Sequence, residues 1–206
     1  MLAEVSRAGE VPAQAAYLDL ADPNLEAVVA AFSTAGERRA IVVPLLFTAA
    51  FHATVDVPQA ITRAVESTGM ELVVADIVGT GADVAALLES ALDAAGVGSD
   101  ASVLLLAVGS SNAAANAAVA DLADRLAADR AARVRAAFAT CDPRPADVVP
   151  DLPEPVAVLP LFLADGLLLD PVRALAVERG WTMADPLGER AAGVVLDRYR
   201  AALDRF

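Results

Sequence analysis

Hydrophobic and polar positions along the chain define two kinds of segment that follow one another. Short, continuous apolar runs such as 40–47 (AIVVPLLF) and 102–109 (SVLLLAVG) are typical of strands buried on both faces of a parallel sheet. Longer segments such as 82–96 carry apolar residues three or four positions apart, as amphipathic helices do. The alternation predicts an α/β protein with mainly parallel sheets flanked by helices.

The same pattern, with helix caps and glycine stops, predicts the limits of each element. The helix at 22–36 is expected to begin with Asp22 as N-cap and to end before Gly36. Gly69 is expected to close the helix at 57–69, and Asn112 is a candidate cap for the helix at 112–132. The expected strands are 13–20, 40–47, 71–79, 102–109, 134–141, 156–163 and a short one within 182–188. The expected helices are 22–36, 57–69, 82–96, 112–132, 170–180 and about 189–204.

An internal repeat divides the chain. The aligned segments are 16–29 with 136–149, and 40–61 with 156–175 across a two-residue gap. The repeat predicts two lobes related by duplication, 1–98 and 99–206. Ligands of such proteins usually bind at the carboxyl ends of the strands, in the crevice between the lobes.

Composition excludes several classes of function. The chain has 206 residues and a net charge of −13, which argues against a nucleic-acid or anionic-membrane partner. The longest mostly apolar run, 40–51, is too short for a membrane span of roughly 20 residues. The first residues lack the pattern of a signal peptide, so a cytoplasmic location is expected.

The rare reactive residues limit the chemistry further. All basic residues are arginines, which removes Schiff-base chemistry, pyridoxal phosphate anchoring and the P-loop lysine. Cys141 is the only cysteine, which excludes an internal disulfide and a cysteine metal cluster, and we expect it to be a small buried residue. His52 is the only histidine, so any nucleophilic catalysis that needs an imidazole would have to use it.

His52 follows the apolar run within PLLFTAAFHATVD (44–56), where a strand is expected to give way to a loop, and the carboxylate of Asp56 comes next. The two copies of the repeat differ here. The first copy has Asp19 and His52 where the second has Ala139 and Leu168 or a near neighbour. Polar groups in one copy only are more consistent with one active site than with two.

Four stretches resemble the class II sirohydrochlorin chelatases: LDLADP, VVPLLFTAAFH with the following DVP, LLAVGSSN, and VLPLFLADGLLLDPV. Members of that family insert Co²⁺ or Fe²⁺ into the tetrapyrrole sirohydrochlorin, towards sirohaem or cobalamin. The resemblance implies two tandem ferrochelatase-like lobes, a divalent metal as substrate and no organic cofactor. It implies that His52 binds the metal and that Asp19 stands at the family's acidic position.

The chemistry of these two groups suits metal insertion. Neutral imidazole binds Fe(II) and Co(II) and also accepts protons, and a carboxylate can accept the pyrrole protons. Ser110 and Ser111 lie at an expected helix start, where backbone amides would bind a substrate carboxylate or simply cap the helix. Arg63 and Arg173 are further candidates for the eight carboxylates of sirohydrochlorin.

The family's first lobe normally opens with a strand that ends in a histidine. Residues 1–20 instead resemble the end of the first helix followed by the second strand, so the first strand is expected to be absent. With strand order 2-1-3-4, the strands at 13–20 and 40–47 would then each have an unpaired edge. Three explanations stay open: a shortened or misassigned start, a sheet that closes up or borrows a partner's strand, and a paralogue that has lost activity.

Two rival functions also stay open. One is a non-catalytic binder of metal or tetrapyrrole with the same fold, and the other is a small-molecule-binding module without metal. The sequence leaves the metal, the macrocycle and the oligomeric state undetermined.

Overall fold

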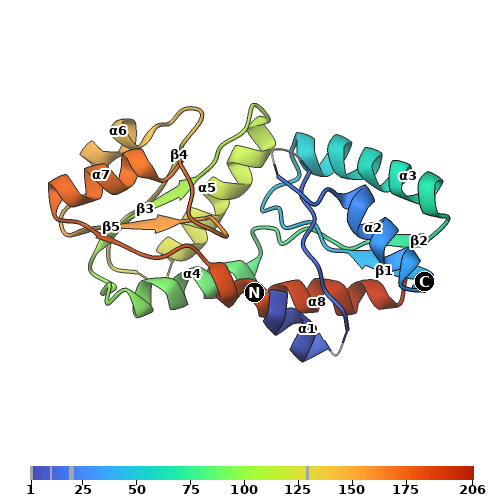
Figure 1. Ribbon diagram of the computed structural model, residues 1–206. Helices are drawn as coiled ribbons and strands as arrows, with labels where there is room; N and C mark the ends of the chain where they lie inside the picture. The colour runs from blue at the N-terminus through green and yellow to red at the C-terminus, as the bar shows by residue number, and fades with distance from the viewer. Residues whose placement is uncertain (1, 10, 19–20, 129) are drawn as a thin grey trace. The chain divides into compact units, whose positions relative to one another are not determined.

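A computed structural model describes residues 2–9, 11–18, 21–128 and 130–206 (Figure 1). The chain forms two compact units, one made of residues 1–79 with 192–206 and the other of residues 80–191. We call them unit 1 and unit 2 and describe each separately.

Unit 2 contains a four-stranded parallel sheet. Its strands are β3 (Ser102–Ala107), β4 (Val134–Phe138), β5 (Val156–Pro160) and β6 (Thr182–Met183). They lie in the order β4-β3-β5-β6, which is the order 2-1-3-4 expected for a lobe. Every residue of β3 and β5 is buried, as their continuous apolar sequences predict.

Helices cover this sheet. They are α4 (Ala82–Ala94), α5 (Ala113–Ala127), the single turn α6 (Pro145–Val148) and α7 (Asp170–Arg179), with 3-10 turns at Val149–Asp151 and Gly188–Ala191. Asn112 caps α5 as predicted, because its side chain accepts a hydrogen bond from the Ala114 amide at 3.0 Å. Gly180 ends α7 in the left-handed conformation (φ +66°).

Arg130 fixes the connection between α4 and β3. Its side chain is only 4% exposed, and it donates hydrogen bonds to the Glu89 carboxylate at 3.2 Å and to the Gly98 carbonyl at 2.5 Å. A buried guanidinium needs such partners. Arg130 therefore ties α4 and the following loop to the segment that follows α5 in unit 2.

Unit 1 has a two-stranded parallel sheet of β1 (Arg39–Val42) and β2 (Glu71–Val74). Its helices are α1 (Leu2–Gly9), α2 (Leu25–Thr34), α3 (Val57–Thr68) and α8 (Ala192–Leu203), with a π-helical turn at His52–Asp56. Leu25 and Val29 of α2 pack with Ala60 and Ala64 of α3 in its core. Arg198 of α8 donates to the carbonyls that follow β2, at 2.8 and 2.9 Å.

The prediction of a strand at 13–20 is wrong over residues 13–18, and residues 19–20 lie outside the described part of the chain. Only an isolated bridge joins Tyr17 to Asn24, where the Tyr17 amide donates to the Pro23 carbonyl at 2.9 Å. In unit 2 the aligned strand β4 pairs with β3. No described strand of unit 1 takes the place of β3, so residues 13–18 have no ladder to join.

Other predicted limits also shift. The strands expected at 40–47 and 71–79 end at Val42 and Val74, because the backbone beyond them turns into loops. Asn24, not Asp22, caps α2, since its side chain accepts from the Ala27 amide at 2.9 Å. Gly69 ends α3 as predicted, with φ +67°.

The compact units do not follow the repeat strictly. Helix α4, which belongs to the first copy of the repeat, lies in unit 2, and α8, from the second copy, lies in unit 1. The compact units therefore do not test the lobe limits 1–98 and 99–206, which describe the two copies of the repeat and stay a prediction. Within the described residues, no helix is long and apolar enough to cross a membrane.

Candidate functional site

His52 does not lie at the end of a strand. β1 ends at Val42, and His52 opens a π-helical turn that runs directly into α3. The Val57 amide donates to the His52 carbonyl five residues earlier. Pro58 explains the wide turn, because it has no amide proton and its ring would clash with the Thr54 carbonyl in a regular α-helix.

Among the described residues, the imidazole of His52 forms one close polar contact. Its Nδ1 lies 2.6 Å from Oδ2 of Asp56, four residues later in the same turn. The His52 side chain is 58% exposed and that of Asp56 is 27% exposed. The ring of Phe51 lies edge-on to the imidazole, with the centroids 6.5 Å apart. This arrangement uses Nδ1 and leaves Nε2 as the nitrogen that can bind a ligand.

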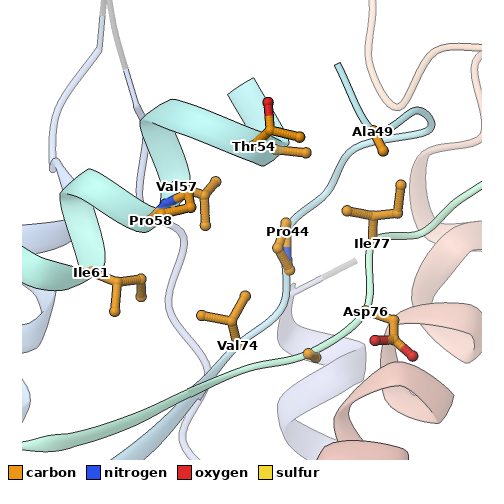
Figure 2. A pocket seen from close by; sticks show the side chains of 11 residues that line it. Pro44, Ala49, Thr54, Val57, Pro58, Ile61, Val74, Asp76 and Ile77 are labelled. Atoms are coloured by element: carbon orange, nitrogen blue, oxygen red, sulfur yellow. The ribbon is translucent and has the colours of Figure 1, made fainter. Parts of the chain in front are cut away.

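A cavity of about 670 Å³ in unit 1 shares a wall with this turn. Figure 2 shows Thr54, Val57, Pro58 and Ile61 along one wall. The other lining residues are Pro44, Ala49, Ala53, Val74, Ala75, Asp76 and Ile77. The volume is typical of small-molecule sites, and the lining is almost entirely apolar.

Asp76 is the one ionisable residue among the described residues of the cavity wall. Its carboxylate forms an ion pair with Arg205 at 2.9 Å, and Arg205 also donates to the Val74 carbonyl at 3.1 Å. These contacts join the end of β2 to the residues that follow α8. The cavity thus lies at the carboxyl ends of β1 and β2, where ligands of parallel α/β proteins bind.

Asp19, predicted to assist His52, lies outside the described residues. Its pairing with His52 at a metal therefore stays a prediction. Among the residues that are described, no group of three or more His, Cys, Asp or Glu side chains is arranged to hold a metal ion.

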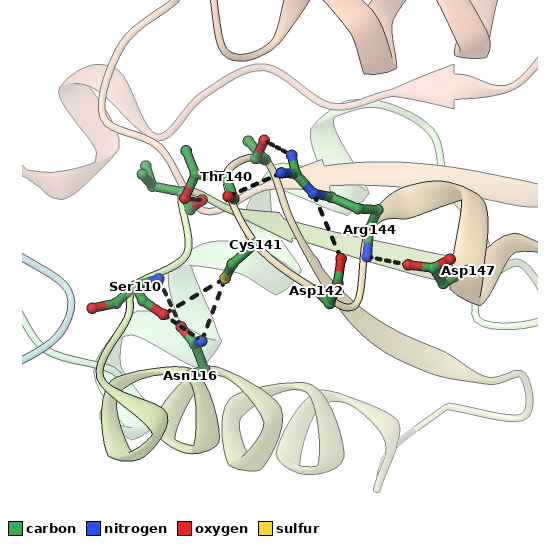
Figure 3. Close-up of polar contacts among 9 residues, drawn as sticks. Ser110, Asn116, Thr140, Cys141, Asp142, Arg144 and Asp147 are labelled. Atoms are coloured by element: carbon green, nitrogen blue, oxygen red, sulfur yellow. Dashed lines mark hydrogen bonds and ion pairs between the residues drawn. The ribbon is translucent and has the colours of Figure 1, made fainter.

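The segment that follows β3 is held by contacts within unit 2 (Figure 3). The Ser110 amide donates to the Asn116 side chain at 2.9 Å, and Asn116 donates back to the Ser110 carbonyl at 2.8 Å and to the Cys141 sulfur at 3.4 Å. Gly109 (φ +91°) is required here, because a Cβ would lie 2.7 Å from that sulfur. An anion-binding role for Ser110 and Ser111 stays a prediction, since the Ser110 amide already has a partner.

Both predicted substrate-binding arginines are paired with carboxylates. Arg63 donates to Glu26 at 2.5 Å, and Arg173 contacts Asp165 and also Asp170, the latter at 3.3 Å. Burial raises the pKa of Glu26, but the hydrogen bond and charge of Arg63 outweigh it, so the pKa lies below its ordinary value. A substrate carboxylate would have to compete with these partners.

The sequence pattern indicated neither the contact between Asp56 and His52 nor the position of the cavity. The four-residue spacing from His52 to Asp56 was a usable signal, because residues four apart lie on one face of a helix. At a strand end, where the apolar run places His52, the same spacing has no such meaning. Val57 and Ile61 of the cavity wall carried no signal, since apolar helix positions are usually part of the core.

Parallel α/β sheets flanked by helices, and an exposed imidazole at the start of a helix, agree with the chelatase-like class that the resemblance implied. The chain belongs to the CbiX family, whose model matches residues 1–95 and again residues 102–196. The double match agrees with the internal repeat. It confirms the resemblance to the sirohydrochlorin chelatases.

Solved structures share the fold. SirB from Bacillus subtilis with Fe³⁺ is 22% identical, with a TM-score of 0.82 over 98% of this chain and 88% of that one. SirB from Bacillus subtilis subspecies spizizenii with cobalt is 21% identical, with a TM-score of 0.76 over 98% and 87%. CbiX, described as the terminal enzyme of sirohaem biosynthesis in denitrifying bacteria, is 21% identical, with a TM-score of 0.74 over 98% and 89%. No curated protein matches this chain.

Proposed function

We propose that this protein inserts a divalent metal, Co²⁺ or Fe²⁺, into sirohydrochlorin, as a lyase of sirohaem or cobalamin biosynthesis. The observation that carries the proposal is the exposed imidazole of His52, held through Nδ1, in the turn that forms one wall of a cavity of about 670 Å³. Membership of the CbiX family supports it, as do the Fe³⁺ and cobalt in the solved SirB structures.

In this reaction His52 receives the metal. The lone pair of Nε2 is a suitable ligand for Fe(II) or Co(II), and the metal is a substrate that leaves with the product. Insertion also releases the two protons of the pyrrole N–H groups, which need a base. We assign that role to the imidazole once it has released the metal, with Asp19 as the second acceptor. No organic cofactor takes part.

The apolar walls of the cavity suit the face or edge of a macrocycle, because they remove apolar surface from water. Ser110, Ser111, Arg63 and Arg173 remain the proposed contacts of the substrate carboxylates. Arg63 would then exchange Glu26 for the substrate, as Arg173 would exchange Asp165.

The proposed partner is therefore the tetrapyrrole. The net charge of −13 supports neither a nucleic acid nor an anionic membrane as a partner. A cytoplasmic location stays a prediction from the sequence.

A second candidate is a non-catalytic binder of metal or tetrapyrrole. It is favoured by the sheet of unit 1, which has two strands among the described residues where the sheet of unit 2 has four. A further catalytic group would project from the end of a strand paired with the other edge of β1. No such strand is among the described residues.

An anaerobic absorbance time course distinguishes a chelatase from a non-catalytic binder. Sirohydrochlorin is mixed with Co(II), and in parallel with Fe(II), in the presence of the wild-type chain, of His52→Ala or of no protein. Insertion faster than the blank, with at least a 100-fold lower kcat/KM for His52→Ala, is the result expected of a chelatase. Binding spectra without accelerated insertion would support the non-catalytic binder.

Leu168→Ala is the matched control, because Leu168 is the exposed residue aligned with His52 in the second copy of the repeat. It is expected to keep the wild-type rate. Equal rates in wild type, His52→Ala and the blank, with no spectral change on mixing, would contradict both candidates.

A further inference from the structure

The carboxylate of Asp56 is not used to cap α3. Aspartate just before a helix usually adopts an extended backbone and accepts a bond from an amide of the first turn. Asp56 instead has a helical backbone (φ −70°, ψ −45°), and its side chain forms no capping bond. Because the π-helical turn runs directly into α3, Asp56 lies within a continuous helical segment, and its carboxylate is directed at His52, with 2.6 Å between Oδ2 and Nδ1.

This contact decides which nitrogen of the imidazole carries the proton. An ionised carboxylate only accepts hydrogen bonds, so Nδ1 must donate. In neutral imidazole the other nitrogen, Nε2, then has the free lone pair. Without a partner at Nδ1, a side chain that is 58% exposed would exchange between both tautomers.

Backbone hydrogen bonds of a single helical turn hold His52 and Asp56 next to each other. The amide and the hydroxyl of Thr54 both donate to the Ala50 carbonyl at 3.1 Å, and the Val57 amide donates to the His52 carbonyl. These bonds fix the turn from both sides of His52. The imidazole and the carboxylate are thus held together by one turn of chain, with no other element needed.

The second copy of the repeat provides an internal comparison. The alignment places Asp170 at the position of Asp56. There the aligned partner of His52 is Leu168, and Asp170 contacts Arg173 at 3.3 Å. Both copies have a carboxylate at the start of the helix, but only the first copy directs it at an imidazole.

From this geometry we infer that Asp56 is the positioning residue of His52: it holds the proton on Nδ1 and presents the Nε2 lone pair to the incoming metal. Histidines that bind metals usually donate their second ring N–H to a carboxylate or carbonyl in this way. The inference rests on the proposed function for the identity of the metal-binding nitrogen.

The tautomer can be measured directly because His52 is the only histidine. A long-range ¹H–¹⁵N correlation spectrum of the tag-free chain, recorded where the imidazole is neutral, shows each ring nitrogen as protonated or unprotonated. The wild-type spectrum is expected to show a protonated Nδ1 and an unprotonated Nε2. In Asp56→Ala both signals are expected to move to the averaged positions of exchanging tautomers.

Glu66→Gln is the matched control, since it removes one exposed carboxylate from the same helix α3. It is expected to give the wild-type spectrum. A wild-type spectrum with a protonated Nε2, a mixture of tautomers in the wild type, or a wild-type spectrum in Asp56→Ala would each overturn the inference.

Binding of Co(II) alone supplies the second readout. Loss of a carboxylate behind a metal-binding histidine typically weakens metal binding on the order of 10- to 100-fold, so about a 10-fold higher Kd is expected for Asp56→Ala. His52→Ala is expected to abolish the binding. An unchanged Kd in Asp56→Ala would overturn the positioning role. If both readouts hold but insertion is not accelerated, the proposed function fails while the role of Asp56 stands.

Discussion

The ion pair between Arg63 of α3 and Glu26 of α2 connects two helices that share the core of unit 1. Because the pKa of Glu26 is lower in the folded chain than its ordinary value of 4.5, the pair stabilises the fold only while Glu26 is ionised. The contribution is complete above the unfolded pKa, and it is lost as the pH falls through the folded pKa.

Glu26→Gln is therefore expected to lower the free energy of unfolding by about 0.5 kcal/mol at pH 7, the range of partly exposed ion pairs. The difference from wild type should shrink as the pH falls below the ordinary pKa of Glu26, because protonation removes the same charge. Urea unfolding of both chains across this pH range measures it. A difference that stays constant with pH, or one matched by Glu66→Gln, would show that the ion pair is not its source.

At the scale of residues, the sequence was informative where chemistry depends on residue type. The single histidine after an apolar run singled out His52, and the family resemblance gave it the role of metal ligand. Its partner was harder to find, since the 2.6 Å contact with Asp56 exists only because residues 52–56 are helical. Asp19 was selected through the resemblance, and its position is not described.

Among the elements, those defined by local signals were predictable. Gly69, Gly180 and Asn112 end or cap helices through their own backbone freedom or side chain, and each does so where expected. Strands depend on partners distant in sequence. Residues 13–18 have the composition of a strand, but no described strand takes the place of β3 beside them. The resemblance predicted that this neighbour would be absent, whereas local composition alone still favoured a strand.

β1 shows the consequence of this missing neighbour. It pairs with β2 alone within the described residues, and three of its four residues are half-buried, whereas β5 lies between β3 and β6 and is buried throughout. Parallel pairing on both edges satisfies the N–H and C=O groups of a strand, while pairing on one edge leaves half of them to water.

We therefore expect the amides of residues 40–42 to exchange with deuterium at least 10-fold faster than those of residues 157–159. Hydrogen–deuterium exchange read by NMR or by mass spectrometry of short peptides measures both strands in one sample. β2, whose one described partner strand is β1, serves as the internal control and should exchange like β1. Equal protection of β1 and β5 would mean that another strand covers the open edge in solution.

For the molecule as a whole, the two copies of the repeat do not coincide with the two compact units. The family model matches 1–95 and 102–196, but α4 of the first copy lies in unit 2 and α8 of the second copy lies in unit 1. Periodicity identified both helices correctly, but it does not indicate which sheet each helix packs against. That choice depends on contacts such as Arg198 with the Ile77 carbonyl, which joins residues 121 positions apart.

The net charge of −13 acts on both proposed substrates, and in opposite directions. A negative protein repels a tetrapyrrole with eight carboxylates and attracts a divalent cation. Raising the ionic strength from 0.01 to 0.15 M shortens the Debye length from about 30 to about 8 Å and weakens both effects. With sirohydrochlorin limiting, the rate of insertion should therefore rise on the order of a few-fold, and with the metal limiting it should fall. Initial rates corrected for the no-protein blank test this. If the rate with limiting sirohydrochlorin falls instead, cationic groups near the site, such as Arg63, outweigh the charge of the whole molecule.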